Sequence, residues 1–222
     1  MALAALPRRD EHARRQLAEA ARGARPVVLA RDRILPVPGP VGERLPSGGL
    51  QRGTVTTVHG PQGAGATSLA LHLAAAASAA GEWVAAVDGE RSLGGIAARE
   101  AGIALDRLAV VRGVSPRQWA ATVAALLDGV ALVLACTPAE VRTGDARGLI
   151  ARARERGAIL VVLGAWPAEA VLRLHATGAS WDGLGDDGTG LLATRPLEFT
   201  VEGRGAGMPV DVPATGRLAR AG

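Results

Sequence analysis

A glycine-rich stretch between an apolar run and an alanine-rich segment has the spacing of a phosphate-binding loop. Gly60, Gly65 and Thr67 occupy the two glycine positions and the hydroxyl position of the pattern G-x-x-x-x-G-K-[ST], and Gly63 and Ser68 complete the stretch. In such loops backbone N–H groups hold phosphates, a lysine neutralises the β- and γ-phosphates, and the Ser/Thr hydroxyl binds Mg²⁺. The spacing therefore predicts a nucleotide-binding loop.

The two charged groups that such a loop needs for hydrolysis are missing. Ala66 stands at the lysine position, and the chain has no lysine elsewhere. The metal-side aspartate is expected where the apolar strand over 130–134 ends, but Ala135 follows there. We therefore expect no enzyme activity and no required cofactor. The loop backbone could still hold an anion, so weak ATP and Mg²⁺ binding stays open.

Other candidates for chemistry are sparse. Glu90 follows the strand expected over 83–88 and could orient a water molecule, but a carboxylate at such a position is more often an ordinary surface residue. We therefore assign no catalytic residue. The histidines are scattered without metal-ligand spacing, and we expect no metal site; they are His12, His59, His72 and His175.

The elements that must position the loop alternate regularly along the chain. Near-continuous apolar strands alternate with helices, which is typical of a parallel sheet covered on both faces. Period-two patterns over 172–177 and 197–201 predict a hairpin that extends the sheet. The fold class is therefore α/β, with a mostly parallel doubly wound sheet and a C-terminal antiparallel hairpin. Strands are expected at 55–59, 83–88, 108–112, 130–134 and 158–163, and helices at 67–80, 96–101, 116–127 and 146–156.

Three segments are expected along the chain. Residues 1–33 form a helical arm, in which Asp10 caps an amphipathic, arginine-rich helix. Residues 34–202 form the core domain, and its proline-rich stretch 35–46 reads as an extended linker. Residues 203–222 are rich in Gly, Pro and Ala, so we expect a flexible C-terminal tail.

Composition narrows the classes of protein further. The 222 residues carry a formal charge of +4, and the pI near 10.9 reflects arginine without lysine or tyrosine, so it is not a nucleic-acid signature by itself. The single cysteine, Cys136, excludes an intrachain disulfide and suits a reducing compartment. The longest alanine-rich run is too short to span a membrane. We expect a cytoplasmic, nucleoid-associated protein with no membrane contact.

These motifs, in this order, resemble the RecA recombinase core. The resemblance covers roughly residues 45–202, and its specific motifs lie mainly within 45–112. It implies a RecA-like P-loop core in which Gly60, Gly65 and Thr67 match phosphate-loop positions and Glu90 matches the water-activating glutamate. The resemblance rests on five segments. They are residues 45–50, the strand together with the loop start at 60–62, and residues 69–72, 87–90 and 102–108.

A lysine-free, degenerate RecA-like chain with an arginine-rich N-terminus is similar to the actinobacterial ImuA-type proteins. This resemblance implies a non-catalytic adaptor in a damage-induced translesion synthesis complex. Its partner would be ImuB, a catalytically inactive homologue of Y-family polymerases, and through the complex an error-prone replicative-type polymerase; contact with DNA would be weak or indirect. Candidate partner-binding residues are Arg14, Arg15 and Leu17 in the arm, and Trp166 and Trp181 near expected loop or hairpin ends.

Two other functions remain open on the sequence alone. One is a DNA-stimulated RecA-like ATPase, which Ala66 and Ala135 argue against. The other is a cell-division inhibitor of the SulA type, which also uses a degenerate RecA-like core. The long N-terminal arm and the retained loop glycines favour the adaptor.

Overall fold

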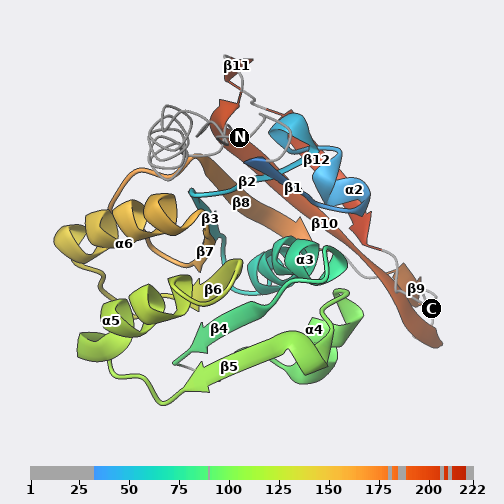
Figure 1. Cartoon of the computed structure of the whole chain (residues 1–222). Helices are drawn as coiled ribbons and strands as arrows, with labels where there is room; N and C mark the ends of the chain where they lie inside the picture. The colour runs from blue at the N-terminus through green and yellow to red at the C-terminus, as the bar shows by residue number, and fades with distance from the viewer. Residues whose placement is uncertain are drawn as a thin grey trace, which may run out of the picture. The chain divides into compact units, whose positions relative to one another are not determined.

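The strand that precedes the glycine-rich loop lies inside a sheet of parallel strands (Figure 1). The computed structural model describes residues 33–89, 91–179, 182–184, 189–205, 208–209 and 212–218. Residues 34–222 form one unit, and this unit contains the sheet. The sheet has the order β8-β3-β7-β6-β4-β5, and each neighbouring pair in this series is parallel. The strands are β3 (Val55–His59), β4 (Val84–Asp88), β5 (Leu108–Arg112), β6 (Leu132–Cys136), β7 (Ile159–Leu163) and β8 (Leu172–Ala179).

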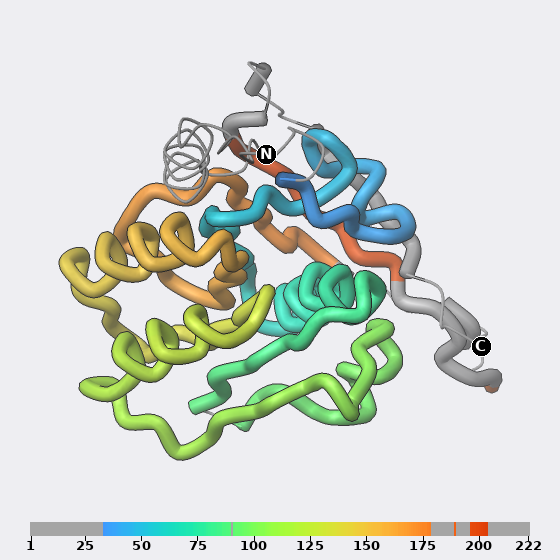
Figure 2. The backbone as a smooth tube through the Cα atoms, in the orientation of Figure 1, coloured from blue at the N-terminus to red at the C-terminus, as the bar shows by residue number. Residues whose placement is uncertain are grey.

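Helices cover both faces of this sheet, as expected for strands that are apolar on both sides. The connections are α3 (Ala66–Ala79), α4 (Gly95–Glu100), η3 (Leu105–Arg107), α5 (Pro116–Leu127) and α6 (Thr143–Arg156). Helix α3 packs on one face, and α5 and α6 pack on the other (Figures 1 and 2). The mostly parallel α/β sheet predicted from the sequence is confirmed.

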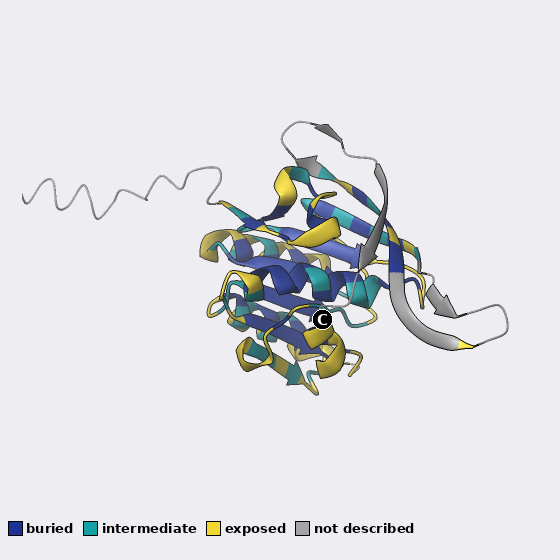
Figure 3. Ribbon diagram, turned by 90° about the vertical axis from the view of Figure 1, so that its right-hand side faces the viewer, coloured by how far each residue is buried: buried dark blue, intermediate teal, exposed yellow. Residues whose placement is uncertain are grey.

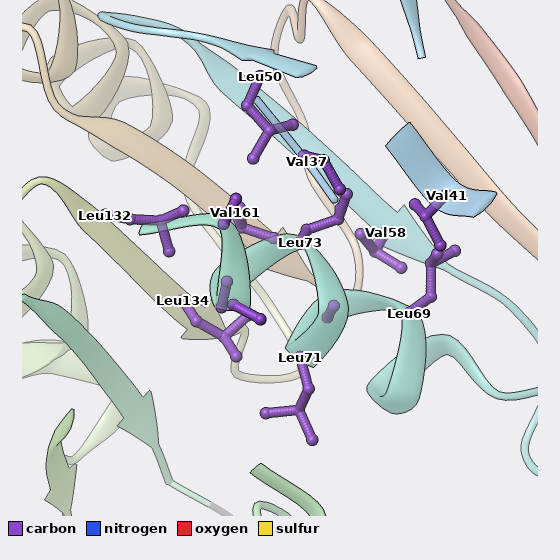
Figure 4. Packing of buried hydrophobic residues seen from close by; sticks show 14 of the residues in the cluster. Val37, Val41, Leu50, Val58, Leu69, Leu71, Leu73, Leu132, Leu134 and Val161 are labelled. Atoms are coloured by element: carbon purple, nitrogen blue, oxygen red, sulfur yellow. The ribbon is translucent and has the colours of Figure 1, made fainter. Parts of the chain in front are cut away.

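Helix α3 fills the core of the first face because its sequence is small and apolar. Alanine has the highest helix propensity, and its short side chain lets the helix approach the sheet closely. Leu69 and Leu73 are fully buried and lie among Val58, Leu134 and Val161 of three strands (Figure 4). Full burial of each such side chain contributes about 1.5–3 kcal/mol, so the helix that begins at the loop is firmly held.

The proline-rich stretch expected to be a linker is instead packed structure. Strand β1 (Ile34–Pro36) pairs antiparallel with β2 (Gly49–Gln51), and α2 (Gly39–Gly42) and η2 (Pro46–Gly48) lie between them in sequence. The prolines fit because they stand at strand and helix ends, where no N–H is needed. The apolar residues between them are buried in the core of the α3 face: Leu35, Val37, Val41 and Leu45.

The C-terminal strands extend the sheet beyond β8. Strand β10 (Gly190–Gly205) pairs antiparallel with β8, with a register shift between Glu198 and Phe199. Strands β9 (Asp182–Leu184), β11 (Met208–Pro209) and β12 (Val212–Leu218) pair with β10. Backbone pairing therefore occurs within 203–222, where we expected a flexible tail, because β10 offers an edge whose N–H and C=O groups need partners.

Burial follows this layering. The inner parallel strands and α3 are largely buried, whereas the edge strand β5 is partly exposed, and other exposed residues lie mainly on the outer sides of helices and in turns (Figure 3). Within the described ranges, no helix has the length and apolar character needed to cross a membrane.

Candidate nucleotide-binding loop

The glycine-rich loop joins the carboxyl end of β3 to the start of α3. Ligands of open α/β sheets bind at the carboxyl ends of the strands, so the loop lies at the expected edge. Gly63 and Gly65 have φ values of +85° and +94°, a region that side chains with a Cβ avoid. Gly65 is also the N-cap of α3, and the Leu69 N–H donates to its carbonyl at 2.9 Å. Both glycines are therefore required by the backbone path.

Gly60 is required for a different reason, which is close packing against β8. A Cβ built on Gly60 would lie 2.4 Å from the carbonyl oxygen of Ala176 and 3.0 Å from its Cβ. Real Cβ atoms do not approach a backbone oxygen so closely. The first glycine of the motif therefore lets the loop leave β3 beside its neighbour strand, so its presence supports the fold independently of any ligand.

The start of α3 offers polar groups but no cation. The backbone N–H groups of Ala66 and Thr67 belong to the first turn, where a helix lacks intrahelical acceptors, and no acidic residue lies there. Half-buried Thr67 follows in the motif. Ala66 packs against the core of the α3 face, in the position where a working loop carries its lysine. The loop therefore keeps a phosphate-binding backbone while an apolar methyl group replaces the ammonium group.

The metal-side position lies one residue later than the sequence indicated. Ala135 is fully buried in the core on the α5 and α6 face, so it points away from α3. Side chains alternate along a strand, and Cys136, the last residue of β6, packs against the core on the α3 face. A thiol at Cys136, rather than Ala135, therefore stands where a strand-end carboxylate would face the loop.

A buried carboxylate beside this position was not singled out from the sequence. Asp88 ends β4 and is fully buried. Its oxygens accept hydrogen bonds from the N–H groups of Ser92 and Leu93 at 2.8 and 3.1 Å, and Arg112 Nε lies 3.5 Å away. Asp88 is thus committed to holding the chain that comes after β4. An aspartate that ends an otherwise apolar strand is the sequence signal that could have identified it.

The sheet also brings together two histidines that are 116 positions apart. His59 ends β3, His175 lies opposite it on β8, and their Nδ1 atoms are 2.6 Å apart. One ring must donate a proton to the other. The pKa of His59 is lowered, first by burial and then by the charges of His175 and Arg173, while Glu202 opposes these effects. No sequence spacing could reveal this pair, because only the parallel pairing of β3 with β8 creates it.

Several predicted site residues lie outside the described residues: Glu90, Arg14, Arg15, Leu17 and Trp181. Trp166 is described. It is partly buried against the α5 and α6 core, and its indole N–H donates to the Glu169 carbonyl at 3.2 Å. Trp166 therefore braces the chain between β7 and β8, and its ring is only partly accessible. In the part of the chain that the structure describes, no three His, Cys, Asp or Glu side chains gather as a metal site would require.

The residues present do not fit a bound ATP–Mg²⁺ that is poised for hydrolysis. The loop backbone and Thr67 suit a phosphate and a metal. However, Ala66 packs against the core, and the position at the end of β6 carries the Cys136 thiol. A thiol is a soft ligand, whereas Mg²⁺ prefers hard oxygen ligands. Among the residues that the structure describes, the arrangement retains the form of an anion-binding loop, with an alanine at the lysine position and a thiol in place of a carboxylate at the end of β6.

Comparison with known proteins relates the chain to two groups. The model of the MT3502 N-terminal domain matches residues 43–168. The chain is similar to the uncharacterized protein Rv3395c of Mycobacterium tuberculosis, with 36% identity over 143 residues, which are 62% of this chain and 66% of that protein. It is also similar to the RecA proteins of Rhodospirillum rubrum (43% over 63 residues, 17% of that protein) and Heliobacterium modesticaldum (40% over 63 residues, 18% of that protein).

These similarities cover parts of the relatives. The chain spans 66% of the length of the mycobacterial relative and less than a fifth of each RecA, whose matched segments are 28% of this chain. A RecA-like relation is therefore confirmed for part of the chain, in agreement with the parallel sheet. The closer resemblance to ImuA-type proteins stays a prediction.

Proposed function

The chain belongs to the MT3502 N-terminal domain family and is related in part to RecA, and from this premise we propose that it is a non-catalytic adaptor of a damage-induced translesion synthesis complex. The observation that carries the proposal is Ala66, whose methyl group packs against the core where a nucleotide-hydrolysing loop needs a cation. The pathway comes from the resemblance to ImuA-type proteins. The partner in this proposal is a catalytically inactive homologue of Y-family polymerases, with DNA contacted weakly or through the complex.

The first test separates the adaptor from a DNA-stimulated ATPase. We expect purified protein to release no phosphate from ATP above background, with or without single-stranded DNA and Mg²⁺, because no side chain at Ala66 or Cys136 can stabilise the transferred phosphoryl group. Thr67→Ala should therefore leave the rate of phosphate release unchanged. Metal-dependent turnover that Thr67→Ala abolishes would contradict the proposal and favour the enzyme.

The second test concerns the partner. We expect the full chain to capture the inactive polymerase homologue from the same organism in a purified two-component binding assay. A tubulin-like division protein should not bind in the same assay. The reverse pattern, with capture of the division protein alone, would replace the adaptor with a division inhibitor of the SulA type.

A further inference from the structure

A cleft lies at the end of the sheet opposite to the glycine-rich loop. It has a volume of about 420 Å³ and lies between α6 and the amino ends of β3 and β8. Figure 1 shows β3 and β8 side by side in the sheet, with α6 on one of its faces. The apolar lining comes from Val55, Ile150 and Val171, and the charged lining comes from Arg154, Arg173 and Glu169. None of these residues belongs to the candidate nucleotide-binding loop.

The walls of the cleft are fixed by hydrogen bonds. The Val171 N–H donates to the Val55 carbonyl at 2.9 Å, which joins the two strand ends. The Arg173 guanidinium donates to the Ala168 carbonyl at 3.0 Å, and Trp166 donates to the Glu169 carbonyl. The chain that precedes β8 is therefore held from two sides. A preformed wall reduces the conformational entropy that binding would cost.

The lining matches a ligand that is partly apolar and partly acidic. Ile150 and Arg154 are four residues apart, so both project from the same side of α6. Ile150 is partly buried and Arg154 is exposed, which places an apolar floor next to a guanidinium group. Arginine is the residue best suited to bind carboxylate in two parallel hydrogen bonds. The two arginines against one glutamate leave the cleft with an excess of positive charge.

Two other occupants fit this lining less well. A nucleic-acid backbone is recognised by an array of basic groups along one face, whereas this cleft has two arginines and a glutamate that repels phosphate. A second copy of the chain placed on the same surface by two-fold symmetry would set one cleft against the other, and two concave surfaces do not fill each other. A carboxylate-bearing protein segment meets neither obstacle.

We propose that this cleft binds an extended segment of a partner protein that carries a carboxylate beside apolar side chains. The proposal rests on the adaptor function and assigns to it a docking surface, formed by α6 and the chain from Trp166 to Arg173. Arg154 pairs with the carboxylate of the segment, and Ile150, Ala170 and Val171, which are partly exposed, contact its apolar side chains. Glu169 disfavours a second acidic group at the other wall.

The test uses substitutions of opposite expected sign in the full chain. Arg154→Glu should raise the Kd for the inactive polymerase homologue about tenfold or more, because an attraction becomes a repulsion. Glu169→Gln should lower the Kd about two- to threefold, since it removes a like charge facing an acidic segment. Arg117→Glu makes the same charge change on the exposed side of the neighbouring helix α5 and should leave the Kd unchanged. All three positions are exposed, so folding should be retained, and circular dichroism checks this.

The outcomes separate the docking surface from the function. If the wild type binds the partner and Arg154→Glu and Arg117→Glu bind it equally well, the cleft is not the docking site, although the adaptor function stands. If Arg154→Glu weakens binding of single-stranded DNA but leaves partner binding intact, the occupant is nucleic acid and the proposal is overturned. If the wild type captures no polymerase homologue, both the adaptor function and this docking surface fall.

Discussion

At the scale of single residues, glycines and alanines decide what the loop can do. Gly63 and Gly65 supply left-handed backbone, Gly60 supplies clearance from Ala176, and Ala66 removes the charge that gives such loops their catalytic use. The first three are needed by the fold whether or not a phosphate binds. Retained loop glycines are therefore evidence for the architecture, and of these four residues Ala66 is the one that bears on activity.

We expect Gly60→Ala to lower the free energy of unfolding by about 1–3 kcal/mol, because the added Cβ would overlap the Ala176 carbonyl and force β3 and β8 apart. Gly148→Ala is the control, since the same methyl group meets open space inside helix α6 and should add about 0.5–1 kcal/mol. Urea denaturation measures both. Equal effects at the two positions would mean that Gly60 is not closely packed.

At the scale of elements, the sequence predicts most of the parallel sheet. Strands β4 to β7 and helices α3 to α6 lie within a few residues of their expected ranges, because long apolar runs and helical periodicity report burial directly. The end of β6 at Cys136 was placed two residues early, since an apolar run does not reveal which face of the sheet each residue occupies. The packed stretch 35–46 was predicted to be a linker because its four prolines indicated an extended chain. The apolar residues in the same stretch indicated burial, and they were given too little weight.

The candidate site was less predictable than the fold. The loop motif lies in one continuous stretch, so it could be recognised from the sequence. The pairing of His59 with His175 instead depends on which strands become neighbours in the sheet. The role of Asp88 depends on its being buried, which a single residue type does not reveal. The cleft beside α6 likewise combines residues 53–55 with two segments, at 150–154 and 169–173, that follow about a hundred residues later in the sequence.

The turn after β4 depends on Asp88. We expect Asp88→Ala to lower the free energy of unfolding by about 2–4 kcal/mol, because it leaves two backbone N–H groups without their charged acceptor and removes the carboxylate beside Arg112, which keeps its hydrogen bond to the Leu93 carbonyl. Amide hydrogen exchange at Ser92 and Leu93 should accelerate in the same variant. Ser92→Ala removes a longer, partly exposed hydrogen bond to Asp88 at 3.3 Å and an exposed contact with Cys136 Sγ at 4.0 Å, and it should cost less than about 1 kcal/mol. Unchanged exchange at both amides would contradict this role.

At the scale of the whole molecule, two histidines link folding to pH. The pKa values of His59 and His72 both lie below 6.5 in the folded chain, chiefly because burial disfavours the charged ring. For His72 a hydrogen bond with the Ser68 carbonyl opposes the effect of burial on the pKa, and for His59 the Glu202 carboxylate opposes it. Between the lowered folded values and 6.5, the unfolded chain binds more protons than the folded chain.

We therefore expect the free energy of unfolding to be constant above about pH 7.5 as far as these groups are concerned, and to fall as the pH drops below about 6.5. Urea denaturation at several pH values between 5 and 8 measures the slope. His72→Gln and His59→Gln should each make the curve flatter on the acid side. Wild-type and variant curves with the same acid slope would show that neither ring resists protonation in the folded state.

The place of β3 in the sheet also governs how the chain can fold during synthesis. Residues 55–59 leave the ribosome before both neighbours of this strand, because β7 and β8 begin only at Ile159 and Leu172. The nascent chain must therefore carry an apolar strand and the alanine-rich helix α3 for more than a hundred residues before the centre of the sheet closes. Such non-local pairing slows folding and exposes the apolar surface of aggregation-prone intermediates. We therefore expect the growing polypeptide to bind chaperones until β8 has emerged.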